Sequence, residues 1–121
     1  ERFGRRFGFG WPSARTRGAE LDAGTRRKIQ IARWMISGAE LLILDEPTRG
    51  VGVEVRRQIY EMMLKFAKRG RTILLISSNL NELFGVTDRI LVMRNGRMAG
   101  NLNTKESTPE EVMHLAAVDD L

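Results

Sequence analysis

The chain has no cysteine, which excludes disulfide bonds and thiolate metal sites and fits a reducing compartment. It has one histidine, which leaves little scope for histidine-based metal or acid–base chemistry. No apolar stretch approaches the roughly 20 residues that a membrane-spanning helix needs, and we recognise no signal-peptide pattern. These absences favour a globular domain that works in the cytoplasm.

The net charge of +5 is unevenly distributed along the 121 residues. Residues 1–33 contain nine Lys and Arg against three acids, whereas residues 34–121 contain eleven against twelve. Such a basic block attracts nucleic acid, anionic lipid or polyphosphate, or simply keeps the chain in solution. The length indicates one domain with a modest core, and the hydrophobic content of 42% is ordinary.

Residues 1–20 show neither a helical nor a strand period. Glycines and arginines are interleaved with Phe3, Phe7, Phe9 and Trp11, so we predict a loop or disordered segment. Arginines beside aromatic rings can stack on single-stranded RNA, which makes RNA binding an alternative function for this segment. The segment occurs once and contains no repeated unit, so the pattern does not favour RNA binding over an ordinary chain end without a function of its own.

The rest of the chain alternates between helical and strand patterns. We predict helices over residues 24–38, 54–68, 80–84 and 109–117, and strands over 41–44, 72–76, 89–93 and 97–101. Asp22 and Thr108 are expected to cap helices, and Gly38 and Gly70 to end them. Asn95-Gly96 predicts a tight hairpin. The alternation indicates an α/β layered sheet, with mostly parallel strands and a C-terminal hairpin and helix.

The most informative segment is Leu41-Leu42-Ile43-Leu44-Asp45-Glu46-Pro47-Thr48-Arg49-Gly50. A short apolar run predicts a strand buried on both faces, and ligands of parallel sheets bind beyond the carboxyl ends of the strands. Asp45 and Glu46 therefore lie where a phosphate and its metal would bind. One carboxylate can hold Mg²⁺ and the other can orient or deprotonate a water. Taken alone, the two acids could equally be solvated residues before a turn.

The order of these segments resembles that of the ATP-binding-cassette (ABC) ATPases over about residues 20–118. The branch it resembles is the second nucleotide-binding domain of bacterial simple-sugar importers of the ribose and galactose type. Further matching segments are Ala32-Arg33-Trp34, Leu74-Leu75-Ile76-Ser77-Ser78 and Asp88-Arg89-Ile90-Leu91-Val92-Met93-Arg94-Asn95-Gly96. The resemblance implies a P-loop NTPase-like fold, ATP and Mg²⁺ as cofactors, and ATP hydrolysis coupled to carbohydrate uptake.

The resemblance also implies roles for individual residues. Asp45 would be the magnesium carboxylate and Glu46 the catalytic one. Ser78 stands at the position of the switch histidine, where the sugar-importer branch has serine. The signature loop, which in the family contacts the γ-phosphate held by a partner domain, corresponds to Leu21-Asp22-Ala23-Gly24-Thr25.

Several features depart from the family pattern. No G-x-x-x-x-G-K-[ST] phosphate loop occurs in these residues. Residues 21–121 are therefore expected to be the C-terminal portion of a nucleotide-binding domain. On its own, this portion should bind ATP weakly or not at all and should not hydrolyse it. Asp22 replaces a phosphate-binding serine and would repel phosphate; its other interpretation is a helix N-cap. Gly52 stands where the family has an aspartate that links the two ATP sites of a dimer. Alternatively, this glycine allows the chain to turn into the next helix. His114 is expected to be a surface or packing residue.

The resemblance implies specific partners and a location. The expected partners are a phosphate-loop-bearing nucleotide-binding domain, a membrane permease and, indirectly, a periplasmic sugar-binding protein. The chain would then lie in the cytoplasm, peripheral to the bacterial inner membrane. A non-enzymatic module that docks on a complete ATPase or permease is an alternative. An incomplete sheet would leave edges and apolar faces uncovered, so self-association is also expected.

Overall fold

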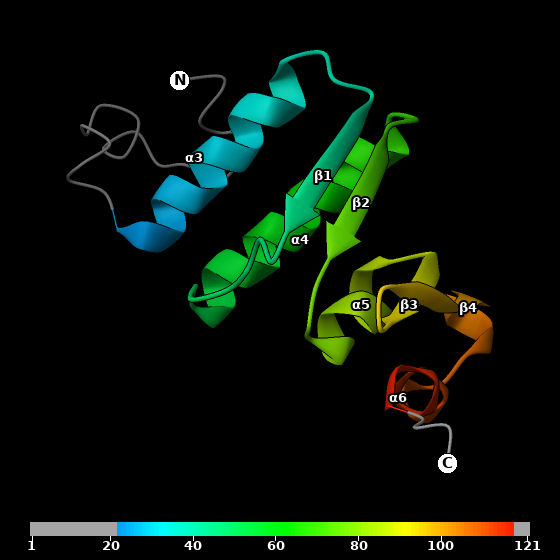
Figure 1. Cartoon of the computed structure of the whole chain (residues 1–121). Coiled ribbons are helices and arrows are strands. Elements are labelled where there is room, and N and C mark those ends of the chain that lie inside the picture. The colour runs from blue at the N-terminus through cyan, green and yellow to red at the C-terminus, as the bar shows by residue number, and fades with distance from the viewer. Residues whose placement is uncertain (1–21, 118–121) are drawn as a thin grey trace. The chain divides into compact units, whose positions relative to one another are not determined.

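The computed structural model describes residues 22–117 (Figure 1). The predictions for residues 1–20, including RNA binding, and the signature position of Leu21 lie outside this range. The described elements are α3 (Ala23–Ile36), β1 (Leu41–Asp45), α4 (Val53–Lys68), β2 (Thr72–Ile76), α5 (Leu80–Val86), β3 (Arg89–Arg94), β4 (Arg97–Asn103), the 3₁₀ turn η2 (Thr104–Glu106) and α6 (Pro109–Ala117). They form two compact units, divided between Ile76 and Ser77.

The first unit is built around a parallel pair of strands. β1 and β2 pair in register from Leu41 with Thr72 to Asp45 with Ile76, and α4 is the crossover between them. Antiparallel strands can be joined by a two-residue turn, but parallel strands need a long connection, usually a helix. The prediction of a β-α-β arrangement from residue 41 to residue 76 is confirmed.

The prediction that β1 is buried on both faces is wrong. Leu42 and Leu44 are buried, but Leu41 is 53% exposed and Ile43 62% exposed. Side chains alternate between the faces of a strand, and residues in register point to the same face. Within residues 22–117, helices therefore cover only one face of the β1–β2 pair. The apolar run alone could not distinguish two covered faces from one.

Each helix of the first unit buries one face, which is mostly apolar. The buried residues of α3 are Gly24, Lys28, Ile31, Ala32 and Met35, and those of α4 are Ile59, Met62, Met63 and Phe66. The methionine pair Met62 and Met63 of α4 thus lies in the core. Gly38 and Gly70 follow the two helices with φ of +87° and +80°, a conformation that glycine adopts without steric cost.

The second unit is a hairpin packed against helices. β3 and β4 are antiparallel, with a register shift at Val92/Met93. The turn residues Asn95 and Gly96 both have positive φ, 49° and 75°, as a two-residue turn that matches strand twist requires. A core of Ile90, Val92 and Val112 is packed by Leu80, Leu83, Phe84, Ala99, Leu102 and Leu115. The predicted hairpin and C-terminal helix are confirmed; η2 was not predicted.

Candidate functional site

The two acids of the central motif occupy different backbone environments. Asp45 is the last residue of β1 and its side chain is exposed. Glu46 begins the following turn with φ of +47°, a left-handed conformation that costs a residue with a Cβ on the order of 1 kcal/mol or more. Its backbone N–H donates to the Ile76 carbonyl at 2.8 Å. The strand pairing thus continues one residue beyond β1, and both acids lie at the carboxyl end of the parallel pair.

Arginines hold Glu46 from two directions. Arg27 Nη1, on α3, donates to the carbonyl oxygens of Glu46 at 3.3 Å and Pro47 at 3.0 Å. Arg49 Nη2 lies 3.5 Å from the Glu46 carboxylate, whose side chain is 21% exposed. The Arg49 backbone N–H donates to the Glu46 carbonyl at 3.2 Å. Sequence reasoning missed Arg27, although its position three residues after buried Gly24 places it near the packed face of α3.

The N-terminus of α3 is capped by its own chain. Asp22 Oδ1 accepts from the Thr25 backbone N–H at 2.7 Å, and Oδ2 accepts from the Thr25 hydroxyl at 2.9 Å. The backbone hydrogen bond from Thr25, followed by the bond from its hydroxyl, holds the pKa of Asp22 below its ordinary value. The N-cap interpretation of Asp22 is therefore confirmed. The Asp22 carboxylate thus occupies the backbone N–H and the hydroxyl of Thr25, two donors at the N-terminus of α3 that another anion could otherwise bind.

Two further residues of the predicted signature loop, Ala23 and Gly24, have different surroundings. Ala23 is exposed, whereas Gly24 is buried. A Cβ on Gly24 would lie 3.0 Å from Val55 Cγ2 and 3.2 Å from Val55 Cγ1. The missing side chain therefore allows α3 to approach α4 closely. In this chain the glycine has a packing role that is visible without any nucleotide.

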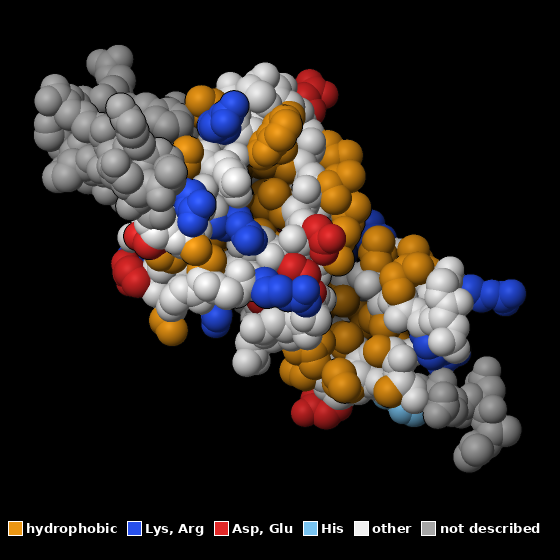
Figure 2. All heavy atoms as spheres, turned by 60° about the vertical axis from the view of Figure 1, so that its left-hand side comes forward, with side chains coloured by type: hydrophobic (Ala, Val, Ile, Leu, Met, Phe, Trp, Pro, Cys, Tyr) orange, Lys and Arg blue, Asp and Glu red, His pale blue; other side chains and the backbone are white. Residues whose placement is uncertain are grey.

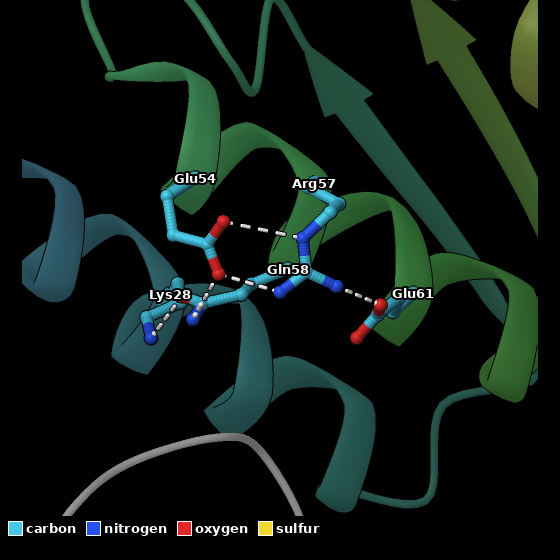
Figure 3. Close-up of polar contacts among 5 residues, drawn as sticks. All are labelled: Lys28, Glu54, Arg57, Gln58 and Glu61. Atoms are coloured by element: carbon cyan, nitrogen blue, oxygen red, sulfur yellow. Dashed lines mark hydrogen bonds and ion pairs between the residues drawn. The ribbon is translucent and has the colours of Figure 1, made fainter.

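A polar network connects α3 to α4 (Figure 3). Lys28 Nζ, whose residue is only 5% exposed, donates to Gln58 Oε1 at 2.6 Å. Burial lowers the pKa of Lys28, and the Asp22 and Glu54 carboxylates partly offset that effect. Gln58 Nε2 donates to Glu54 Oε1 at 3.4 Å. A lysine is rarely buried unless it is paired, so these contacts make the helix interface polar at one point.

The outer surface of α4 continues this network. Arg57 makes two hydrogen bonds to Glu54, at 2.5 and 3.3 Å, and an ion pair with Glu61. These bonds raise the pKa of Arg57 and lower that of Glu54. The three side chains are more than half exposed, and solvent-exposed pairs of this kind contribute little to stability.

The remaining predicted site residues lie elsewhere. Gly52 is the N-cap of α4 with φ of −71°, so its backbone does not require glycine. Ser78 is exposed and belongs to the second unit. His114 is exposed on α6, consistent with the predicted surface role. Asp45 and Glu46 are thus adjacent in the first unit, and the Asp22–Thr25 segment begins the helix that carries Arg27.

Within residues 22–117, no group of three or more His, Asp or Glu side chains could enclose a metal ion. Magnesium in nucleotide sites is usually held by one or two carboxylates together with phosphate oxygens and water. The exposed carboxylate of Asp45 at the end of β1 fits that arrangement. None of the described helices combines the length and the apolar character needed to cross a membrane.

The sequence of this chain is similar to those of known ATP-binding proteins. The chain is 47% identical over 106 residues to the galactose/methyl galactoside import ATP-binding protein MglA of Vibrio vulnificus, matching 88% of this chain and 21% of that protein. It is 49% identical over 98 residues to the protein of that name from Sodalis glossinidius, matching 81% of this chain and 19% of that protein. The chain belongs to the ABC ATP-binding proteins.

Solved structures show the same fold. An inward-facing ABC transporter described as metal-chelate type superposes with a TM-score of 0.81 at 18% identity, over 94% of this ABC chain and 45% of that chain. An ADP-bound ATP-binding cassette gives 0.64 at 25% identity, over 78% and 36%. No protein-family model matches. The ABC chain thus spans about a fifth of the length of its curated relatives, and the ABC ATPase fold class is confirmed.

Proposed function

We propose that this chain is part of an ATP-binding subunit that energises carbohydrate import across the bacterial inner membrane. The observation that carries the proposal is the pair Asp45 and Glu46 at the carboxyl end of parallel strands, with Glu46 held in a left-handed turn. The relatives at 45–49% identity are galactose and methyl galactoside importer subunits. The subunit would act at the cytoplasmic face of the membrane.

In the proposed site, each acid has its own role. Asp45 would hold Mg²⁺ through its exposed carboxylate. When bound, the ion would supply charge neutralisation to the β- and γ-phosphate oxygens of ATP. Glu46 would orient or deprotonate the attacking water, because its carboxylate is adjacent and is fixed by the turn. The Glu46–Arg49 pair must loosen for that carboxylate to accept a proton.

The rest of the proposed ATP site requires other segments or partners. These 121 residues contain no G-x-x-x-x-G-K-[ST] motif, whose backbone N–H groups and lysine cradle the phosphates. A phosphate-loop-bearing nucleotide-binding domain, a permease and a periplasmic sugar-binding protein are the proposed partners. The Asp22–Thr25 segment would bind the partner's nucleotide only weakly, since the Asp22 carboxylate repels phosphate. Gly52 and Ser78 would occupy the degenerate loop and switch positions.

Titration calorimetry with ATP and Mg²⁺ tests the proposal in two arms. The chain alone should bind weakly or not at all and should not turn ATP over. In a longer polypeptide that contains these residues together with a phosphate loop in the same domain, E46Q should abolish ATP turnover and D45N should lower it by orders of magnitude. E61Q, an exposed glutamate of α4, is the matched control. Micromolar binding by the lone chain, or full turnover with E46Q, would contradict the proposal.

A second candidate function is a docking module without catalysis. The face of the β1–β2 pair that carries Leu41, Ile43, Leu74 and Ile76 favours it, because each of these side chains is 44–62% exposed. Hydrophobic side chains also reach the surface over a broad part of the view in Figure 2. In this case the chain should form a stable complex with a complete ATPase or permease in gel filtration, and E46Q should leave the ATP turnover of that complex unchanged.

A further inference from the structure

Arg27 connects the first turns of α3 to the turn that follows β1. One nitrogen, Nη1, donates to the carbonyl oxygens of both Glu46 and Pro47. These carbonyls belong to consecutive peptide units, so a single side chain restrains two successive planes of the backbone. We infer that Arg27 is a positioning residue that sets the direction of the Glu46 carboxylate through the backbone.

The conformation of Glu46 makes such a restraint necessary. Its φ of +47° is one that residues with a Cβ adopt only where the surroundings impose it. On the N-terminal side, the Ile76 carbonyl holds the Glu46 N–H. On the C-terminal side, Arg27 and the Arg49 N–H share the Glu46 carbonyl. Without Arg27, the first restraint remains and the second is weakened, so the peptide planes after Glu46 can rotate.

The position of Arg27 on α3 gives the contact a further consequence. Arg27 follows Asp22, the N-cap of α3, by five residues and lies on the same helix. Arg27 therefore links the helix that begins at the signature position to the acid that the proposed function assigns to water activation. A lysine could reach the same carbonyls with an ammonium group but without the planar fork of guanidinium.

The first test measures ATP turnover and rests on the proposed function. It uses the longest polypeptide that contains this chain, assembled with its phosphate-loop-bearing partner and permease. R27Q should lower kcat about tenfold or more while KM for ATP changes less than about twofold, since binding contacts remain and positioning is lost. R27K should recover part of kcat. R26Q, at an exposed neighbouring residue of α3, should match wild type.

The second test does not depend on ATP and uses the 121-residue chain. Hydrogen exchange should show the Arg49 amide exchanging about tenfold faster in R27Q than in wild type or R26Q, because opening of the turn exposes it. The amides of β2 should keep wild-type rates, which excludes general unfolding. An unchanged Arg49 amide overturns the inference, as does an R27Q kcat equal to wild type. If E46Q fails to lower turnover, the proposed function is wrong, and exchange alone then decides the role of Arg27.

Discussion

Lys28 Nζ lies 2.6 Å from Gln58 Oε1, and this hydrogen bond crosses the interface between α3 and α4. Lys28 is 5% exposed, so its ammonium group is largely removed from water. An ammonium removed from water needs acceptors, since an unpaired buried charge is costly. The interface is consequently specified by a polar contact as well as by the apolar residues around it.

Replacing Gln58 by methionine should destabilise the chain by about 1–3 kcal/mol, because the buried ammonium loses an acceptor. Glutamine and methionine side chains have nearly the same volume, so little of the effect should come from a cavity. Urea unfolding followed by circular dichroism measures it. Q30M, at an exposed glutamine on α3, is the control and should stay close to wild type. Equal stability of Q58M and Q30M would show that Lys28 does not depend on Gln58.

Asp22 should make the stability of α3 depend on pH. The pKa of Asp22 is lower in the folded chain than its ordinary value of 3.8. Its contribution to the free energy of unfolding is therefore complete above pH 3.8 and is lost as the pH falls through the lowered pKa. D22N retains an effective N-cap without a titrating group, whereas D22A removes the cap. Unfolding free energies measured at several pH values should show the advantage of wild type over D22N shrinking in acid. D22A should be less stable than D22N throughout.

A side chain added at Gly100 should force Leu115 to move. A Cβ at this position of β4 would lie 2.6 Å from Leu115 Cδ1 on α6 and 3.8 Å from Val92 Cβ on β3. G100A is expected to cost about 1 kcal/mol, because the Leu115 side chain must leave its preferred rotamer. The double variant G100A/L115A should lose less than the sum of the two single variants, and this coupling identifies the clash. Additive losses in thermal unfolding would mean that the strand, and not the contact, is sensitive.

The exposed face of the β1–β2 pair should drive association of the isolated chain. Ile43 is 62% exposed at its centre, in register with Leu74, and contiguous exposed apolar surface favours self-association. Sedimentation velocity should show concentration-dependent species for wild type and fewer for I43K. L64K, at an apolar residue of α4 that is 46% exposed, adds the same charge elsewhere and should associate like wild type. A monomeric wild-type chain would contradict the prediction.

Much of the fold could be predicted because its signals are local. Asp22 and Thr108 cap helices with their own side chains, and Gly70 and Asn95-Gly96 adopt positive φ where the chain must turn. The alternation of helix and strand patterns, together with the order of short motifs, identified the ABC fold class before any coordinates. The exposure of one face of β1 could not be predicted, because the sequence of a strand does not specify what covers each of its faces.

The sequence by itself determined the elements, their ends and the placement of two acids after an apolar strand. Periodicity, capping and turn chemistry act within a few residues, and the chain records them directly. Only the tertiary structure decided that Arg27 restrains the Glu46 turn from 19 residues away, that Gly24 serves a helix contact, and that one sheet face is uncovered. These are relationships between segments distant in sequence, and they exist only once packing brings the segments together.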